Sequence, residues 1–370
     1  MGQSVIGRIA RGLGVTASLQ SAWTRYMRGE GERLRRELRD ELKAELGRLA
    51  TEQERMSRVV ASLQGSLLEA VAKQERAERR ANQFILTSVL NEKQRDHMER
   101  LPFVLDPARV SAHVRDAVGR AALIADPFPH MVVDDVVPSD VYKMMLRAIP
   151  PPDFFGDKDY IKQNLRIPVG AGPELTVQVW QFVDDVIARA VVVPAVMARF
   201  DEPLRGHYRT IFGDEFVARA AELPQSPSGG RVMLRRPGYH LAPHRDPKRS
   251  MLTCLMYLAA PGDDESYGTK IFRVSGDHES SYTQTYYPEQ SGAACELVKM
   301  VPFRPNSMLV FLNGAGAHGA DIPADAPADL ERYSYQFYVG PSSEEMGRLI
   351  ADLPPERRRM WQDKSTAMGD

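Results

Sequence analysis

Apolar residues recur at steps of four and three between about residues 30 and 100, in a stretch that is otherwise charged and nearly free of glycine and proline. This heptad spacing is typical of a coiled coil, in which one apolar seam of each helix faces a partner. The seam positions are Leu42, Leu46, Leu49, Gln53, Met56, Val60, Leu63, Leu67, Ala70, Gln74, Ala77, Ala81 and Phe84. A helix of this length has no core of its own. We therefore predict a coiled coil over 29–100 that joins the chain to itself as a dimer or trimer. The alternatives are a helix folded back on the rest of the chain and a helix paired with another protein.

The helical pattern is expected to end at Leu101-Pro102, because proline disfavours helix in the residue before it. Residues 127–146 predict a short strand followed by a helix, with a helix-start signal at Pro138-Ser139-Asp140. Further helices are expected over 175–200 and 202–222, and a loop over 227–230.

Short runs rich in Val, Leu, Phe, Tyr and Met follow from Arg231 onward, separated by Gly, Pro, Asn and Asp. Such runs without alternating helices indicate an antiparallel sandwich or barrel, such as a jelly roll. The expected strands are 231–236, 250–259, 270–274, 295–303, 307–313 and 332–339. A final charged helix and tail over 344–364 is expected to be interrupted at Pro354-Pro355.

Composition narrows the function classes. The 370 residues carry a formal net charge of −1, which gives no indication of a nucleic-acid partner. The two cysteines, Cys254 and Cys295, form neither a disulfide framework nor a cysteine-type zinc site, which favours a reducing, cytoplasmic compartment. No apolar run approaches the roughly 18–20 residues that span a bilayer.

The first 28 residues are basic and contain no acidic residue. They lack the continuous apolar region of a secretory signal. Gly12 and Gly14 interrupt a long helix, which favours a basic lead-in to the coiled coil. The alternatives are a basic amphipathic segment in peripheral contact with a membrane and a transit-type peptide.

Candidate chemistry lies in the second half of the chain. His244 and Asp246 are two residues apart, so on an extended strand both side chains point to the same side. His318 follows the strand-like run 307–313 and is the natural third group. Two histidines and one carboxylate make the facial triad that binds iron(II) and leaves positions open. A His-x-Asp pair alone is weak evidence, because it also arises by chance.

Further features occur in a fixed order around this pair. They are the strand and helix of 127–146, the spacing Gly238, Leu241, His244 and Asp246, the strands 251–259 and 301–311, His318-Gly319, and Arg332-Tyr333-Ser334. Over about residues 125–340 the chain thus resembles the iron(II)/2-oxoglutarate oxygenases, in their prolyl-4-hydroxylase-like branch.

The resemblance implies an α+β chain with a double-stranded β-helix (jelly roll) and flanking helices over 101–345. The coiled coil precedes this domain, and a C-terminal helix and tail, 346–370, follow it. His244, Asp246 and His318 become the catalytic iron(II) ligands, with 2-oxoglutarate and dioxygen as co-substrates and ascorbate as a reductant. Because the carboxylate of Asp246 is present, the implied reaction is hydroxylation, with release of succinate and CO2.

The same resemblance gives Arg332 and Ser334 to the co-substrate. A buried dianion needs a cation at its far carboxylate, and the planar fork of arginine suits that group. Many relatives carry a co-substrate tyrosine nine residues before the first metal histidine, where this chain has Arg235. Tyr239, Thr253 and Tyr257 are candidates to replace that tyrosine, and Arg235 is a candidate contact to the co-substrate or to an acidic substrate.

Two other features leave alternatives open. His240 is expected to be structural or to support the site from outside, since Pro237 and Pro243 oppose the helix that a His-x-x-x-His metal site needs. The polar loop 274–294 is expected either to be a lid that contacts substrate through Tyr282, Tyr286 and Tyr287 or to be an insertion with no direct role.

Two other classes of function compete with an oxygenase of unidentified substrate. One is a cupin-like metal enzyme, which has no need of a keto-acid clamp such as Arg332. The other is a coiled-coil scaffold with a sensing or inactive barrel.

Overall fold

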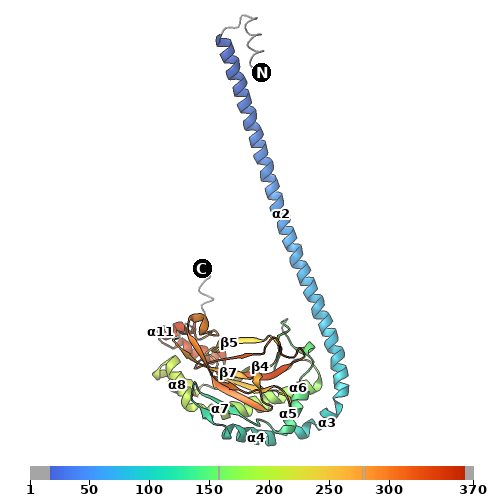
Figure 1. The fold of residues 1–370 in the computed structure, drawn as a ribbon, viewed down its shortest axis with the longest axis vertical. Helices are drawn as coiled ribbons and strands as arrows, with labels where there is room; N and C mark the ends of the chain where they lie inside the picture. Colours follow the sequence, from blue (N-terminus) through green and yellow to red (C-terminus); the bar gives the residue numbers. More distant parts are fainter. Residues whose placement is uncertain (1–16, 157–158, 277, 280, 363–370) are drawn as a thin grey trace. The chain divides into compact units, whose positions relative to one another are not determined.

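The computed structural model describes residues 17–156, 159–276, 278–279 and 281–362 (Figure 1). The chain divides into two compact units between Glu78 and Arg79. Gly12 and Gly14, on which the expected basic lead-in depends, lie outside the described residues.

The described part of the first unit is one helix. Helix α2 (Ala17–Lys93) is 77 residues long and continues into the second unit. The apolar side chains of the seam are exposed, for example Leu46 at 58% and Leu63 at 64%. The long helix is confirmed, and its pairing with a second copy stays a prediction. Among the described residues no helix is long and apolar enough to cross a membrane.

The expected helix end at Leu101-Pro102 is wrong. Helix α2 stops at Lys93, and α3 (Arg95–Val104) runs through Pro102. Proline inside a helix removes one backbone donor. Here the helix nevertheless closes beyond it, because the amide of Leu105 donates to the carbonyl of Leu101 at 2.8 Å. Leu101 is buried in the core, so packing holds this turn against the local preference.

Helices cover one side of the second unit. They are α4 (Pro107–Arg120), α5 (Ser139–Arg147), α6 (Glu174–Phe182), the π-helix η2 (Val183–Val192), α7 (Val193–Arg199), α8 (Asp201–Phe212) and α9 (Val217–Glu222). The single helix expected over 202–222 is wrong, because the chain turns at Gly213 with φ of 104°, a left-handed value that favours glycine. The C-terminal helices α10 (Ser343–Ala351) and α11 (Pro355–Arg358) are separated before Pro355, as predicted.

Two antiparallel sheets form the rest of the second unit. The larger has the order β1-β2-β9-β6-β11-β4-β3, and the smaller has the order β5-β10-β7-β8. The strands of the larger sheet are β1 (Leu123–Ile124), β2 (His130–Val133), β3 (Lys162–Arg166), β4 (Ser226–Arg235), β6 (Leu252–Tyr257), β9 (Ser307–Leu312) and β11 (Arg332–Gly340). Those of the smaller sheet are β5 (His240–His244), β7 (Thr269–Ser275), β8 (Ala294–Val301) and β10 (Ala317–Asp321).

Each strand expected from Arg231 onward is present, but the loop expected over 227–230 is wrong. Those residues belong to β4 and pair with β11, where Pro227 lies opposite Val339 and Ser228 opposite Tyr338. Gly229 has φ of 63° where the register shifts, so the glycine accommodates an irregular strand rather than ending it.

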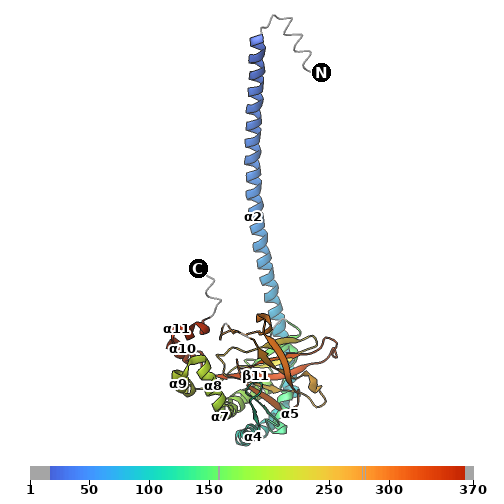
Figure 2. The same ribbon diagram turned by 60° about the vertical axis from the view of Figure 1, so that its left-hand side comes forward.

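Alternate residues of the larger sheet face two different cores. Cys254 and Met256 of β6 belong to the large core that includes helix residues such as Trp180, whereas Leu255 and Tyr257 belong to a smaller cluster with Ile271 of β7. The smaller cluster contains residues of both sheets, so it lies between them. Both views show α4, α5 and α7 on the same side of the strands (Figure 1, Figure 2). The inner faces of the sheets are therefore the surfaces that can enclose a site.

Candidate metal centre and its cavity

Strand pairing brings the two candidate histidines together. His244 ends β5, His318 lies on β10, and the two residues are direct partners in the register of these strands. Asp246 follows two residues after His244. The possible ligand atoms of the three residues lie within 4.8 Å of one another. The predicted triad is therefore assembled in space, and all three side chains are buried.

Gly319 allows the two strands to approach. A Cβ atom at this position would lie 2.7 Å from the carbonyl oxygen of Leu241 on β5, closer than real side chains come to backbone. The register of β5 and β10 also shifts between His318 and Ala320. Glycine is thus required beside the second histidine by sterics between the strands.

Hydrogen bonds orient the ligands. Nδ1 of His244 lies 3.0 Å from the carbonyl of Ala242, which places the proton on Nδ1 and the lone pair on Nε2. Nε2 lies 3.7 Å from Oδ1 of Asp246, and Nε2 of His318 lies 3.9 Å from Oδ2 of Asp246. The nitrogen lone pairs and the carboxylate therefore converge on one point.

A second layer of contacts holds Asp246. The hydroxyl of Thr253 donates to Oδ2 of Asp246 at 2.9 Å and lies 2.6 Å from the side-chain amide of Asn313. The Asn313 atom at this distance is Oδ1, so the single hydrogen of the Thr253 hydroxyl faces two acceptor oxygens, one from Asp246 and one from Asn313. The Thr253 hydroxyl thus contacts one carboxylate oxygen of the triad.

The electrostatics suit a divalent cation. Burial raises the pKa of Asp246, but the hydrogen bond with His244 and the charges of His318 and His244 outweigh it and hold the pKa at about 2. Burial, followed by the neighbouring His244, lowers the pKa of His318 to about 3. A carboxylate and neutral imidazoles are the protonation states that a metal needs. Two histidines and one carboxylate are also the donor set of iron(II) sites with open coordination positions.

The triad opens into a cavity of about 230 Å³ whose lining comes from both sheets. Four basic residues line it: Lys162, Arg231, Arg235 and Arg332. Asp246 is the one carboxylate among the lining residues. Apart from the metal ligand, the cavity thus presents positive charge.

Arg332 is buried without an acidic partner among the described residues. Its Nε donates to the carbonyl of Tyr267 at 2.5 Å, and its guanidinium lies over the ring of Phe303 at 4.7 Å. Its Nη2 is buried and has no hydrogen-bond partner in the described part of the chain. Burial lowers the pKa of Arg332, because removal from water disfavours its charged form. Ser334 lies two residues after Arg332 on the same strand. Its hydroxyl is also buried and has no hydrogen-bond partner in the described part of the chain.

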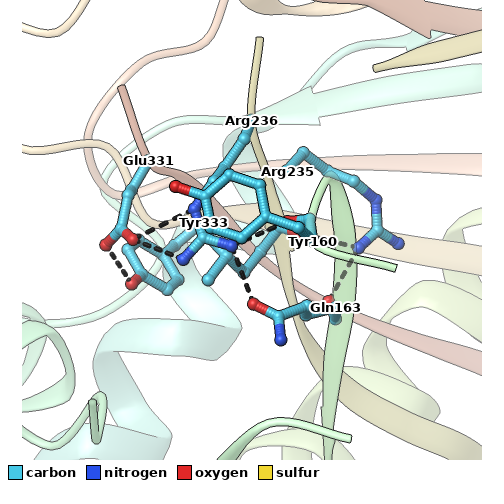
Figure 3. A network of polar contacts seen from close by, with 7 residues as sticks. Tyr160, Gln163, Arg235, Arg236, Glu331 and Tyr333 are labelled. Carbon is cyan, nitrogen blue, oxygen red and sulfur yellow. Dashed lines mark hydrogen bonds and ion pairs between the residues drawn. The ribbon is translucent and has the colours of Figure 1, made fainter. Parts of the chain in front are cut away.

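Arg236 shows the contrasting case (Figure 3). It is as buried as Arg332, at 3% exposure, yet it pairs with Glu331 at 2.6 Å. It also donates to the side chain of Gln163 and the carbonyl of Tyr160, both at 2.7 Å. The chain thus provides a carboxylate for Arg236 and none, within the described residues, for Arg332. The pocket around Arg332 has the properties of a binding site for an external anion.

Arg235 points to the opposite side from Arg236 (Figure 3). Its guanidinium donates to the carbonyl of Gln163 at 2.8 Å and to Oδ1 of Asn164 at 3.0 Å, and it lies over the ring of Tyr239 at 5.1 Å. Arg235 is the register partner of Arg332, so the two arginines lie side by side on the cavity wall.

The candidates to replace the tyrosine of the relatives differ in their availability. The hydroxyl of Thr253 is engaged with Asp246, and that of Tyr257 donates to Thr269 at 2.8 Å. Tyr239 lines the cavity beside Arg235. Of the three, Tyr239 is the one placed for contact with a bound anion. His240 is exposed and lies outside the triad.

The loop 274–294 contributes one of its three candidate tyrosines to the cavity. Tyr287 lies against the ring of His244, with 5.7 Å between centroids. Tyr286 instead pairs with Arg245 through two backbone hydrogen bonds of 2.8 and 3.0 Å. Tyr282 packs on Trp361 and under Lys248, and its amide donates to the carbonyl of Met360. The described part of the loop is thus a wall of the site, tied to the C-terminal segment.

The sequence patterns did not single out Asn313, Lys162 or Arg231. Asn313 immediately follows β9, and Arg231 lies on an expected strand, two residues before Met233 and four before Arg235. The two-residue period of that strand is a signal that could have placed Arg231 on the inner face.

No family model matches the chain, and no curated protein sequence is significantly similar to it. Solved structures show partial likeness. One is a prolyl-4-hydroxylase from Pseudomonas putida, 16% identical, with a TM-score of 0.34 over 63% of this chain and 98% of that one. A second is HygX from Streptomyces hygroscopicus with nickel, 2-oxoglutarate and hygromycin B bound, 13% identical, with a TM-score of 0.31 over 58% of this chain and 83% of that one.

A third is an oxidoreductase of the 2OG-Fe(II) oxygenase family from Burkholderia pseudomallei, 9% identical, with a TM-score of 0.34 over 57% of this chain and 84% of that one. At such scores the likeness identifies neither the family nor the function of this chain.

Proposed function

We propose that this chain is an iron(II)- and 2-oxoglutarate-dependent dioxygenase that hydroxylates its substrate and releases succinate and CO2. The observation that carries the proposal is a buried arginine, Arg332, that has no acidic partner in the described part of the chain and lines the same cavity as a His–Asp–His triad. Bound iron and keto acid supply the activation of dioxygen. The chain supplies the ligands, the orientation and the enclosure of the site.

Each residue then has a defined task. His244, Asp246 and His318 hold the metal, and the Thr253 hydroxyl keeps Asp246 in place. Arg332 and Ser334 bind the far carboxylate of 2-oxoglutarate. The apolar walls around the triad, such as Leu241 and Leu255, limit access of water. In this proposal the two facing antiparallel sheets are a double-stranded β-helix of the prolyl-4-hydroxylase-like kind, and ascorbate keeps the iron reduced.

Arg332 also weighs against the competing functions. A cupin-like isomerase or hydrolase has no use for a buried guanidinium that lacks a counter-charge. An inactive barrel has no reason to keep an unpaired buried charge, since such a charge destabilises the fold. We further infer that α2 joins copies of the chain through its exposed seam and that the protein acts in the cytoplasm. Assembly by α2 is compatible with catalysis.

The test is an anaerobic titration with iron(II) and 2-oxoglutarate, followed by the weak visible charge-transfer band that a keto acid gives when it chelates iron(II). The band is expected in the wild type and lost in His318→Ala and Arg332→Ala. His240→Ala, which removes an exposed histidine from β5, is the matched control and keeps the band. A folded, metal-loaded wild type that gives no band refutes the oxygenase and favours the cupin-like or scaffold function.

A further inference from the structure

Arg231 is a second cation of the cavity that has no counter-charge among the described residues. It lies on β4, and its Nη2 donates to the side chain of Gln336 and to the hydroxyl of Tyr338, the latter at 3.1 Å. Both partners are neutral. No carboxylate of the described residues lies within 4.0 Å of its guanidinium. An amide and a phenol thus hold the guanidinium in position and leave its charge uncompensated.

Strand register places Arg231 at the opposite end of the cavity from Arg332. Arg231 pairs with Gln336, while Arg235 pairs with Arg332. Four residues along an extended strand correspond to roughly 13 Å. Tyr338, the partner of Arg231, lies near the metal site, because it is the register partner of Thr253, whose hydroxyl donates to Asp246 at 2.9 Å. Arg231 is therefore close to the metal end, and Arg332 is at the far end.

Bound iron(II) and 2-oxoglutarate would neutralise Arg332 but not Arg231. With metal and keto acid bound, Asp246 and the near carboxylate offset the two charges of iron(II), and the far carboxylate offsets Arg332. Arg231, Arg235 and Lys162 remain. Arg235 and Lys162 are register partners at the Arg332 end of the cavity, so Arg231 is the lining cation that remains at the metal end. The co-substrate therefore does not account for this positive end of the cavity.

Arg231 is also accessible from outside. It borders both the cavity and a groove along β3 that is lined by residues such as Leu165, Val169 and Gly230. The cavity of about 230 Å³ has to hold the keto acid as well, so only a small part of a substrate enters it. A substrate that comes in along this groove meets Arg231 before it reaches the metal.

We propose that the substrate carries an anionic group, a carboxylate or a phosphate, which binds Arg231. The C–H bond to be hydroxylated then lies between this group and the metal. Arginine suits either anion, because its fork binds two oxygens at once. This inference rests on the proposed function and deepens it by naming a substrate class and its specificity-determining residue.

The test uses the full chain, loaded anaerobically with iron(II) and saturated with 2-oxoglutarate. The visible band then reports that the metal and co-substrate site is occupied. Calorimetric titrations then measure the binding of three probes: N-acetylglycine, its neutral amide, and methyl phosphate. Binding is expected for at least one anion and not for the amide, and the anion that binds identifies the source of the charge. Arg231→Gln is expected to lose tenfold or more in affinity for that anion, a larger loss than for 2-oxoglutarate. Lys162→Gln, which removes a cation at the Arg332 end of the cavity, is expected to keep its affinity for that anion.

The control variant is Arg115→Gln, which makes the same charge change at an exposed position of α4 and keeps anion affinity. If the band forms but neither anion binds, or if Arg231→Gln binds the anion as well as the control does, the inference is overturned and the oxygenase stands. If the band never forms, the proposed function fails and takes this substrate assignment with it.

Discussion

Thr253 is the side chain on which the geometry of the carboxylate ligand depends. Its hydroxyl donates to Oδ2 of Asp246 at 2.9 Å and lies 2.6 Å from Oδ1 of Asn313. Thr253→Val keeps the shape of the side chain and removes the hydroxyl. We expect roughly tenfold weaker iron(II) binding, the lower end of the effect seen for residues that support metal ligands. Metal-competition titrations measure this loss.

The conservative variant separates the hydroxyl from the packing of Thr253. Thr253→Ser keeps the donor and is expected to restore most of the metal affinity. If the Thr253→Val and Thr253→Ser variants bind iron(II) equally well, the Thr253 hydroxyl does not position Asp246.

The sequence predicts the three triad residues better than it predicts the residues that contact them. The spacing of His244 and Asp246 and the place of His318 after a strand were sufficient to bring the triad together. Arg332 could be named because its residue type and position matched a family motif. The two-residue period could have placed Arg231 on the inner face but could not show its neighbours, and nothing marked Asn313, since both depend on pairings between strands that are distant in the chain.

Strands β5 and β10 carry the triad, and Gly319 sets the distance between them. Gly319→Ala places a methyl group against the carbonyl of Leu241, which the backbone can avoid only by moving the strands apart. We expect a lower melting temperature and a metal affinity reduced by tenfold or more. Gly347→Ala on α10 is the control, because nothing lies within 4 Å of its new methyl group, and alanine favours a helix by about 0.5–1 kcal/mol.

Differential scanning fluorimetry and metal titration of the two variants provide the comparison. Equal behaviour of Gly319→Ala and Gly347→Ala would show that the strands are not in close contact.

Hydrophobic patterning explains which elements the sequence predicts. Strands such as β6 and β9, which bury both faces, are apolar throughout and were expected. The sequence of β10, Ala317–Asp321, carries a histidine, a glycine and an aspartate, so no apolar run marks it. Helix α4 was also missed, although Asp106 caps it and proline starts it. Sites are built where the core pattern is weakest, which is why their strands are hard to predict.

Acid is expected to destabilise the whole molecule through buried histidines. Burial lowers the pKa of His207 on α8 to about 3, from about 6.5 in the unfolded chain. Between these values the unfolded state binds a proton that the folded state does not. The free energy of unfolding is therefore fully retained above pH 6.5 and falls as the pH decreases, by up to about 1.4 kcal/mol per pH unit for one such group.

Urea unfolding of metal-free protein between pH 7.5 and pH 5 measures this slope. His207→Phe fills the same space without a proton site, so its slope is expected to be smaller, with His318 supplying part of the remainder. An unchanged slope would mean that His207 is already protonated in the fold.

Self-association is a property of the whole molecule and depends on the seam of α2. Leu46 and Leu63 lie on the seam, and Leu68 is as exposed but lies off it. We expect the wild type to be a dimer or trimer by light scattering after gel filtration. Leu46→Glu combined with Leu63→Glu is expected to give a monomer, because charge in the seam costs several kcal/mol on association.

The single change Leu68→Glu is expected to leave the oligomer intact. Equal masses for all variants would mean that the seam does not hold the copies together.

The strand order also has a consequence for how the protein is made. In the larger sheet β11 lies between β6 and β4, so β4 and β3 are joined to the remaining strands through the last strand of the chain. Until Arg332–Gly340 has been synthesised, the ribosome holds a chain that already contains His244, Asp246 and His318, the three proposed metal ligands, but an unfinished sheet. Since domains complete their folding as units during synthesis, iron is expected to enter late, after the C-terminal strand has been released. A message truncated before residue 332 would yield a chain that carries every ligand and keeps no metal.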